Sequence, residues 1–498
     1  MKKLFTLMVV SFCGIMAYAQ TISMQNVTMS PGETKTIEVS ISNPSNYTAF
    51  QFDLTLPKGI KIKNANMKGS YGSDRVLKNQ LINQNSNKYR FLSYDGKNAG
   101  FQGSGAVAVI TLEAETDAES GTITGSDMLV VKPDGTSSST TASATVTINA
   151  SITIGSSGKT TFVCDRDLDF SNVADVKAYI ATGYDLVSND LWLTRVTDVP
   201  ANTPIWVKGP ANSTKAIPFG TSSTYYPTTL LVGSATQSVN IPAEDADFKN
   251  WTLMSDGSII PQPSGVSGFP AQKAYLHIPK AVTSSVGSDK TLTLASTKNT
   301  TLVYGYDLDF SNVSGLRAYT ITGYGKDGTI WLTRVMKASA GTPLYLKGDA
   351  AGDYTIPSTE QQIYYANMLR GDATTGAALT SPSDGMTIFL LYSDGIWAAL
   401  SGQANYPEGK SYFAVPSSYI AAASRGMGDE INNVFENESE VMVIKLGKTA
   451  GEDNRTTAIR AIDAQQSDDA WFNLNGQRID TPTKKGLYIK NGKKVIVR

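Results

Sequence analysis

The sequence predicts an all-β protein built from several domains. Three observations indicate this fold class: short segments in which apolar and polar residues alternate, turns rich in Gly, Pro and Asn between them, and a long segment that occurs twice in tandem. At 498 residues, and with about 150 residues per domain, roughly three domains and some tails are expected. A hydrophobic content of 41% and a net charge of −1 favour packed cores over disorder.

Residues 1–19 have the features of a secretory signal peptide. A charged start is followed by a short apolar run and by Ala17-Tyr18-Ala19, a small-x-small cleavage motif. We expect cleavage before Gln20 and a protein that is secreted or held at the outer cell surface. Cys164 is then the single cysteine that remains, which excludes an intrachain disulfide. No later apolar run reaches the about 18 residues that a membrane-spanning helix requires, so no transmembrane segment is predicted after the signal peptide.

Residues 20–150 are predicted to form a two-sheet antiparallel sandwich. In the segment 36–41 the side chains of Ile37, Val39 and Ile41 alternate with polar ones, so they lie on one face of a strand. Short strands separated by turns every eight to twelve residues or so are typical of such sandwiches. Further strands are predicted at 49–56, 89–93, 106–114 and 144–148.

Several of these segments also carry a family resemblance. They are Pro31-Gly32-Glu33-Thr34 with the strand that follows, the segment 49–57, and the later strand 105–112. Together they resemble a cohesin-type module, a jelly-roll or immunoglobulin-like sandwich related to some carbohydrate-binding modules. Cohesins hold dockerin domains in secreted assemblies, and relatives bind polysaccharide. The resemblance therefore implies non-catalytic recognition of a dockerin-like protein or of a polysaccharide. Residues 56–58 (Leu-Pro-Lys) stand where cohesins often have a Tyr-Asp-Pro turn.

Residues 158–285 and 298–424 are two copies of one β-module. The motif Asp-Leu-Asp-Phe-Ser-Asn-Val at 167–173 recurs at 307–313, and neighbouring motifs recur in the same order. The polar segment 284–299 joins the copies. The distance along the chain between equivalent residues of the two copies shortens by one residue at a time near 185–190, 227–232 and 258–268, where surface loops are predicted.

The C-terminal part has two predicted regions. Residues 425–469 are rich in Asp, Glu, Asn and Gly, which is typical of an extended linker, with one strand possible at 441–446. Residues 470–498 are predicted to form a small β-domain with a hairpin around Asn491-Gly492, a type I′ turn pair. This tail is similar to C-terminal sorting or anchoring domains of surface-exported proteins in gut and oral Gram-negative bacteria, and the tandem modules resemble modules of secreted proteins in those bacteria.

Aromatic residues of the duplicated modules are the candidate ligand-binding residues, because aromatic rings can stack on the faces of sugars. Most aromatic residues of a β-sheet pack against neighbours. The two tyrosine pairs are expected to be the best exposed, because Pro227 and a predicted loop follow the first pair. The candidates are Trp206, Tyr225 and Tyr226 in the first copy and Tyr345, Tyr364 and Tyr365 in the second.

No metal site is predicted. Asp165, Asp167 and Asp169 alternate as at the start of a calcium loop, but Phe170 stands where that loop needs Gly and Val176 where it needs Glu. We interpret the motif as a polar turn that caps its own backbone.

No catalytic site is predicted either. The single histidine, His277, is replaced by Ala414 in the second copy, and we interpret it as a histidine on a strand face. One histidine and one remaining cysteine exclude catalytic triads and His-rich metal centres. A glycosidase needs only two carboxylates, and Asp167/Asp169 with Asp307/Asp309 are the pairs that recur.

The sequence thus predicts a non-enzymatic secreted or cell-surface protein that needs no cofactor. Its partner is predicted to be a polysaccharide or a secreted protein, bound through the cohesin-like domain. Nucleic acid is excluded because no cluster of Lys and Arg is present. Two alternatives remain open: a structural or adhesive stalk built from the tandem modules, and, as the least favoured, a carboxylate-only glycoside hydrolase.

Overall fold

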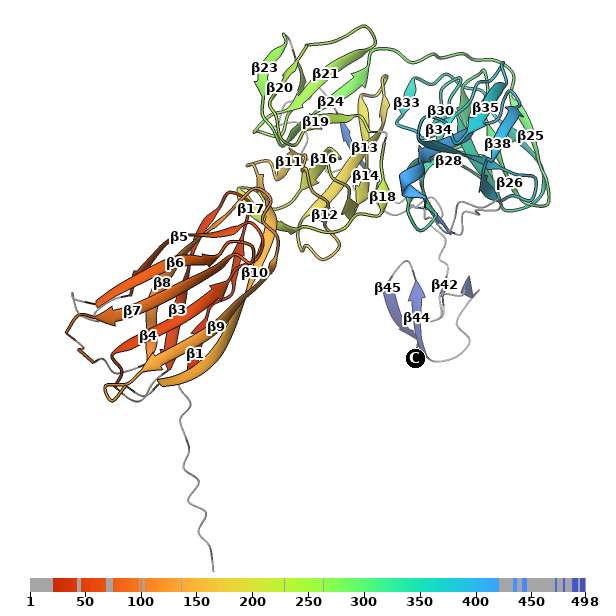
Figure 1. Cartoon of the computed structure of the whole chain (residues 1–498). Helices are drawn as coiled ribbons and strands as arrows, with labels where there is room; N and C mark the ends of the chain where they lie inside the picture. The colour runs from red at the N-terminus through yellow and green to blue at the C-terminus, as the bar shows by residue number, and fades with distance from the viewer. Residues whose placement is uncertain are drawn as a thin grey trace, which may run out of the picture. The chain divides into compact units, whose positions relative to one another are not determined.

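The computed structural model describes residues 21–420, apart from 43–45, 69–74, 98, 101–103, 136, 228 and 263, and beyond residue 420 only strands between 433 and 497. The predicted signal peptide lies outside these residues. The regular secondary structure of the described residues consists of β-strands and one short 3₁₀ helix, η1 (Ser417–Tyr419), which confirms the all-β class (Figure 1). None of its helices has the length and apolar character needed to cross a bilayer. Two units are present, Met1–Ser151 with Ala216–Phe219, and Ile152–Lys215 with Gly220–Arg498.

The first unit is a sandwich of two sheets. The smaller sheet has the order β1-β3-β8-β5, and the larger has the order β17-β10-β9-β4-β7-β6 with β2 beside β10. The strands of the smaller sheet are β1 (Thr21–Met24), β3 (Thr34–Ser42), β5 (Ile60–Met67) and β8 (Gly105–Ala114). Those of the larger are β2 (Val27–Met29), β4 (Ala49–Thr55), β6 (Arg75–Asn83), β7 (Lys88–Asp95), β9 (Gly121–Val131), β10 (Ser137–Ile154) and β17 (Ser213–Pro218).

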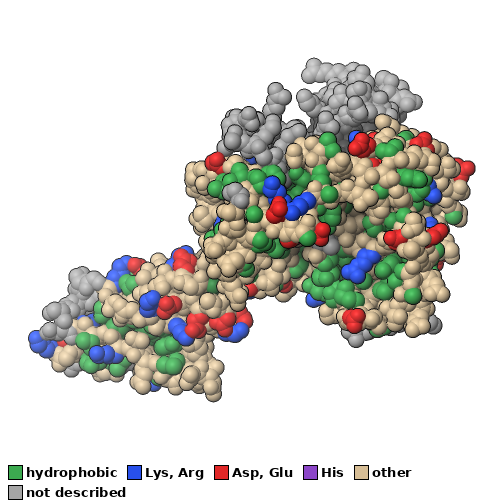
Figure 2. Space-filling view, turned by 90° about the horizontal axis from the view of Figure 1, so that it is seen from above, with side chains coloured by type: hydrophobic (Ala, Val, Ile, Leu, Met, Phe, Trp, Pro, Cys, Tyr) green, Lys and Arg blue, Asp and Glu red, His purple; other side chains and the backbone are tan. Residues whose placement is uncertain are grey.

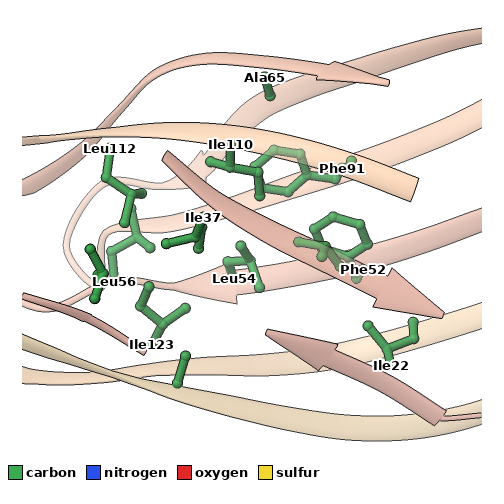
Figure 3. Packing of buried hydrophobic residues seen from close by; sticks show 14 of the residues in the cluster. Ile22, Ile37, Phe52, Leu54, Leu56, Ala65, Phe91, Ile110, Leu112 and Ile123 are labelled. Carbon is green, nitrogen blue, oxygen red and sulfur yellow. The ribbon is translucent and has the colours of Figure 1, made fainter. Parts of the chain in front are cut away.

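One apolar core fills the space between these sheets. Ile37 of β3 and Ile110 of β8 face Phe52 of β4 and Phe91 of β7, and Figure 3 shows their side chains between the two layers. The rings of Phe52 and Phe91 stack at a centroid distance of 4.7 Å. Alternation along each strand sends every second side chain into this layer, which is why the five strands predicted from that pattern are all present.

The second unit contains both copies of the module, and each copy has a main sheet packed on a second one. In the first copy the main sheet has the order β11-β16-β13-β14-β41 and the second sheet β19-β24-β21-β22. The main-sheet strands are β11 (Lys159–Phe162), β13 (Lys177–Asp185), β14 (Asp190–Val196) and β16 (Ile205–Lys208). The others are β12 (Leu168–Asp169), β15 (Asp198–Val199), β18 (Thr224–Tyr225), β19 (Leu231–Ser234), β20 (Val239–Ile241), β21 (Phe248–Leu253), β22 (Ile259–Pro261), β23 (Val266–Phe269) and β24 (Lys273–Pro279).

The second copy repeats this arrangement. Its main sheet has the order β26-β31-β28-β29-β40 and its second sheet β34-β39-β36-β37. The main-sheet strands are β26 (Asn299–Leu302), β28 (Leu316–Gly325), β29 (Thr329–Val335) and β31 (Leu344–Gly348). The others are β25 (Lys290–Leu294), β27 (Leu308–Asp309), β30 (Lys337–Ala338), β32 (Gly352–Ile356), β33 (Ile363–Tyr365), β34 (Leu369–Arg370), β35 (Ala377–Ser381), β36 (Met386–Leu391), β37 (Trp397–Ala399), β38 (Gly402–Tyr406) and β39 (Tyr412–Pro416).

The structure corrects two details of the predicted organisation. The predicted joining segment 284–299 contains β25, which pairs with β32. The predicted loop at 258–268 contains β22 and most of β23. β22 and β23 are too short and too exposed for alternation to reveal them, because half or more of their side chains face solvent or lie at the surface.

The C-terminal residues also form strands. β40 (Asn433–Glu436) and β41 (Val441–Lys445) lie within the predicted linker, and β41 matches the one strand expected there. The C-terminal sheet has the order β43-β42-β44-β45. Its strands are β42 (Trp471–Phe472), β43 (Arg478–Ile479), β44 (Gly486–Lys490) and β45 (Lys493–Val497). β44 and β45 pair antiparallel up to Lys490 and Lys493, which is the hairpin predicted on either side of Asn491-Gly492.

Phe91→Ala should destabilise the sandwich by about 3–5 kcal/mol, because it removes a fully buried ring and leaves a cavity. The neighbouring Leu92→Ala is the matched control, since Leu92 is 40% exposed and its loss should change stability by less than about 0.5 kcal/mol. Pulsed hydrogen exchange during guanidinium unfolding measures the stability of the sandwich separately, through the amide exchange of peptides from residues 21–150. Equal losses for the two variants would contradict the observed core.

Candidate functional site

The two tyrosine pairs lie in short strands that cross between the module copies. β18 of the first copy pairs antiparallel with β28 of the second, and β33 of the second pairs antiparallel with β13 of the first. Tyr225 lies opposite Tyr324, and Tyr364 lies opposite Tyr184. Each copy therefore contributes one strand to the main sheet of the other.

Backbone hydrogen bonds repeat the same reciprocity. The Lys326 N–H donates to the carbonyl of Ser223 at 2.7 Å, and the Leu186 N–H donates to the carbonyl of Gln362 at 2.9 Å. These pairs occupy equivalent positions in the two copies. When a residue of one copy contacts a residue of the other, and the two equivalent residues make the same contact in the reverse sense, the copies are related by a two-fold axis. The tandem copies are thus joined as a pseudo-symmetric pair.

The tyrosine rings pack into the partner copy. Tyr225 packs against the core of the second copy and lies 5.1 Å from the ring of Tyr419. Tyr364 packs against the core of the first copy, with its ring edge-on to Phe248 at 6.4 Å. Burial raises the pKa of the Tyr225 and Tyr364 phenols, so both stay neutral at pH 7.

A glycine in each copy makes room for this packing. Gly183 and Gly323 lie at equivalent register shifts of β13 and β28. A Cβ on Gly323 would lie 2.6 Å from Cε1 of Tyr226, and a Cβ on Gly183 would lie 2.5 Å from Cε3 of Trp192. Trp192 in turn stacks on Tyr365 at 5.6 Å and 11°. Close approach, not a positive φ, is the reason for glycine at both positions.

The exposure expected for the candidate aromatic residues is therefore corrected. Tyr225, Tyr226, Tyr364 and Tyr365 lie at the junction between copies, because their strands complete the partner sheet. Trp206 and Tyr345 are buried in the cores of the two copies, with exposed fractions of 0% and 3%. The structure gives these residues a packing role, and ligand binding by them stays a prediction.

The recurring aspartates hold loops together. Asp307 is fully buried and accepts hydrogen bonds from the backbone N–H groups of Ala340 at 2.7 Å and Gln361 at 2.8 Å. The equivalent Asp167 accepts from Ala201 and Ser222, both at 2.7 Å. Because Ser222 and Gln361 lie just before β18 and β33, each aspartate fixes the start of a crossing strand. This long-range role differs from the self-capping turn that was predicted.

The second aspartate of each motif forms the predicted local turn. The Ser171 N–H donates to Oδ1 of Asp169 at 2.8 Å, and the Ser311 N–H donates to Oδ1 of Asp309 at 2.8 Å. These are Asx turns, in which the side chain imitates a backbone turn. Among the residues that the structure describes, no group of three or more His, Cys, Asp or Glu side chains is arranged to hold a metal ion.

His277 lies on a strand of the first copy, as expected. Its ring stacks on Phe248 at 4.1 Å, and its Nδ1 lies 2.7 Å from Oδ1 of the buried Asn250. Burial lowers the pKa of the imidazole, so it is neutral at pH 7. Cys164 is buried as well, and burial raises the pKa of its thiol, which disfavours the reactive thiolate.

The outer face of the larger sandwich sheet carries the surface feature that the sequence reasoning missed. Leu92 and Tyr94 of β7 are 40% and 43% exposed. In the ladder Leu92 lies opposite Gln51, which lies opposite Leu129, and Tyr94 lies opposite Val76. Side chains directly opposite each other share a face. Alternation along 89–93 contained this signal, because the residues between the buried ones had to point outward.

A charged group borders this apolar zone on the same face. Arg90 binds Asp53 with two hydrogen bonds, 2.7 Å from Nε to Oδ1 and 2.9 Å from Nη2 to Oδ2, and Lys88 lies 3.1 Å from the same carboxylate. The Arg90 hydrogen bond holds the pKa of Asp53 below its usual value, against the opposing effect of burial. Elsewhere Figure 2 shows acidic and basic side chains in small scattered groups, not in one basic patch, on the face that it draws.

Fold and site together define a multidomain β-protein with an exposed apolar and charged sheet face. No protein-family model matches the chain, and no curated protein matches it. Solved structures that are similar to part of it include a non-cellulosomal cohesin from the archaeon Archaeoglobus fulgidus, with 17% identity, a TM-score of 0.22, and coverage of 26% of this chain and 91% of that one.

Two further cohesin structures are similar to the same extent. A cohesin module of a family 33 glycoside hydrolase from Clostridium perfringens has 15% identity and a TM-score of 0.23, and the match covers 26% of this chain and 96% of that one. A type I cohesin–dockerin complex from Clostridium thermocellum has 12% identity and a TM-score of 0.22, covering 26% and 95% of the respective chains.

Gly323→Ala should destabilise the second unit by about 1–3 kcal/mol, because the added methyl group overlaps the Tyr226 ring. Gly305→Ala is the matched control, since a Cβ there meets no atom within 4 Å and the cost should stay below about 0.5 kcal/mol. Guanidinium unfolding followed by tryptophan fluorescence measures this, because residues 20–150 contain no Trp. A neutral Gly323→Ala would show that the strand exchange is looser than observed.

Asp307→Asn should lower the free energy of unfolding of the second unit by about 1–3 kcal/mol. The reason is that the new amide N–H₂ group would face a buried backbone N–H that has lost its acceptor. Asp309→Asn keeps an Asx turn and should change stability by less than about 0.5 kcal/mol. The same fluorescence assay compares them, and EDTA should leave the melting temperature unchanged. Stabilisation by added calcium that Asp307→Asn abolishes would indicate a cation site instead.

Proposed function

We propose that this is a secreted or cell-surface, non-catalytic binding protein whose N-terminal sandwich recognises a protein partner. The single observation that carries the proposal is the outer face of β9, β4, β7 and β6, where Leu92 and Tyr94 are exposed beside the Asp53–Arg90 pair. An apolar centre next to a polar, charged border is the composition of protein–protein interfaces. Tyr and Arg are also enriched among the residues that dominate binding energy.

The face favours a protein over a polysaccharide. Its apolar members are mainly aliphatic: Leu92, Leu129, Val76 and Val131 accompany one tyrosine, Tyr94, on the described parts of these four strands. A polysaccharide site of the kind first considered stacks sugar rings on aromatic faces, and a single tyrosine gives a short platform. The cohesin-type resemblance of the sequence supports a dockerin-like partner in particular.

The non-catalytic part of the proposal is supported by how the recurring carboxylates are used. Asp167 and Asp307 accept backbone N–H groups from separate loops, and Asp169 and Asp309 cap local turns. A glycosidase requires one carboxylate that activates water or attacks the sugar and another that donates a proton. Carboxylates whose oxygens accept several backbone N–H groups are poor candidates for either role, so the hydrolase alternative ranks last.

A structural role is a second candidate for the duplicated modules. The reciprocal pairing of β18 with β28 and of β33 with β13 ties the copies together through backbone hydrogen bonds. Tandem domains joined only by a linker can turn freely, whereas copies that complete each other's sheets cannot. This observation favours a stiff spacer or stalk that presents the sandwich.

The test is binding of the full chain, immobilised for interferometry, to a panel of dockerin modules and to soluble xylan, β-glucan and mannan. The double variant Leu92→Ala with Tyr94→Ala should weaken dockerin binding by at least about tenfold. Leu81→Ala is the matched control, because Leu81 is 41% exposed but lies opposite Tyr89 in the ladder, on the other face of the sheet from Leu92 and Tyr94. Polysaccharide binding that the double variant leaves intact, with no dockerin bound, would contradict the proposal.

A further inference from the structure

The main sheets of the two copies end in equivalent strands that would otherwise be open edges. β14 and β29 contain the repeated sequence Trp-Leu-Thr-Arg-Val, and each pairs on its inner side with the long central strand of its own sheet. An open edge presents unpaired N–H and C=O groups and is a template for another strand. The described part of the chain covers both edges, and it does so with strands from outside both copies.

Both covering strands come from one short stretch of chain. β41 pairs antiparallel with β14 and places Val443 opposite Trp192. β40 pairs parallel with β29 and places Phe435 opposite Trp331. Because Trp192 and Trp331 are equivalent residues, the same position of each edge is covered. Only residues 437–440 separate β40 from β41 along the chain.

The opposite directions of pairing fit the two-fold relation between the copies. A two-fold axis perpendicular to two equivalent strands makes them run antiparallel. One segment that continues in a single direction past both strands must be parallel to one and antiparallel to the other. The parallel pairing of β40 with β29 and the antiparallel pairing of β41 with β14 match this pattern. The five Cα–Cα steps from Glu436 to Val441 reach at most about 18 Å, so the two edges must meet closely.

We propose that the edges of β14 and β29 form one binding site for a single extended polypeptide, filled in this structure by the chain's own strands β40 (Asn433–Glu436) and β41 (Val441–Lys445). Recognition of this kind uses main-chain hydrogen bonds for affinity, so it requires an extended segment free of proline, not one particular side chain. The resident segment is exchangeable: once it is cut free, a peptide of the same sequence takes its place. The site is independent of the sandwich face and does not rest on the function proposed above.

One consequence concerns the C-terminal sheet. The strands β42 to β45 follow the resident segment in the chain. If that segment is held by backbone pairing at two edges, the C-terminal part remains attached to the modules after a cut on the N-terminal side of Asn433. The site thus retains the tail without a covalent link.

Peptide exchange on the full chain tests the proposal. Specific protease sites are inserted among residues 425–432 and after Lys445, and the cut protein is mixed with a fluorescein-labelled peptide of residues 430–448. The released resident fragment should be replaced by labelled peptide with saturable binding. A control peptide carrying Met442→Pro and Val443→Pro should bind at least about tenfold more weakly, because adjacent prolines remove the N–H that points at β14. Equal binding of the two peptides, or none of either, would refute the exchangeable site.

Hydrogen exchange on the uncut chain tests whether the two edges are one site. With Met442→Pro and Val443→Pro, amides of β14 should exchange faster, and those of β29 should do so too, because the same segment leaves both. Faster exchange in β14 alone would show two independent pairings and contradict a single site. Unchanged exchange in β24 and β39, the second-sheet strands of the two copies, is the control that the second unit of the variant is folded.

Discussion

The architecture of the second unit depends on the need to pair strand edges. A backbone N–H or C=O left unpaired away from water costs about as much as a lost hydrogen bond, and an open sheet edge exposes a row of them. Each module copy pairs its edges with strands that come from outside that copy. β18 and β33 are exchanged between the copies, and β40 and β41 lie on the opposite edges. Duplication followed by such exchange converts two modules into one pseudo-symmetric body.

The side chains that make this exchange possible are modest in kind. Glycine at positions 183 and 323 leaves space for an aromatic ring, and a buried aspartate at 167 or 307 fixes the loop from which the crossing strand starts. None of these residues would be conspicuous alone. Their recurrence in both copies reflects one local geometry that the chain uses twice.

The sandwich and the duplicated modules divide the work differently. In the sandwich, alternation leaves one face of the larger sheet free, and that face combines exposed Leu92 and Tyr94 with an Arg90–Asp53 pair. In the modules, comparable aromatic residues are packed inside: Trp206 and Tyr345 lie in the cores, and the tyrosine pairs lie at the junction between the copies. Under the proposed function, recognition belongs to the first unit, and the second presents it and holds the C-terminal segment.

The sequence by itself determined the all-β class, the strands with regular alternation such as β3, β4 and β8, the tandem duplication, and the hairpin of β44 and β45. These features are local or repetitive: a two-residue period, a turn pair or a recurring motif is visible without knowing what lies across the sheet. Short strands such as β22 and β23 escaped because few of their side chains are buried. Only the tertiary structure decided where Tyr225 and Tyr364 pack, that Asp307 accepts a hydrogen bond from Gln361, and which strands β40 and β41 pair with. Each of these joins residues far apart in the chain, and burial depends on which strand arrives on the other side, a choice that no local pattern encodes.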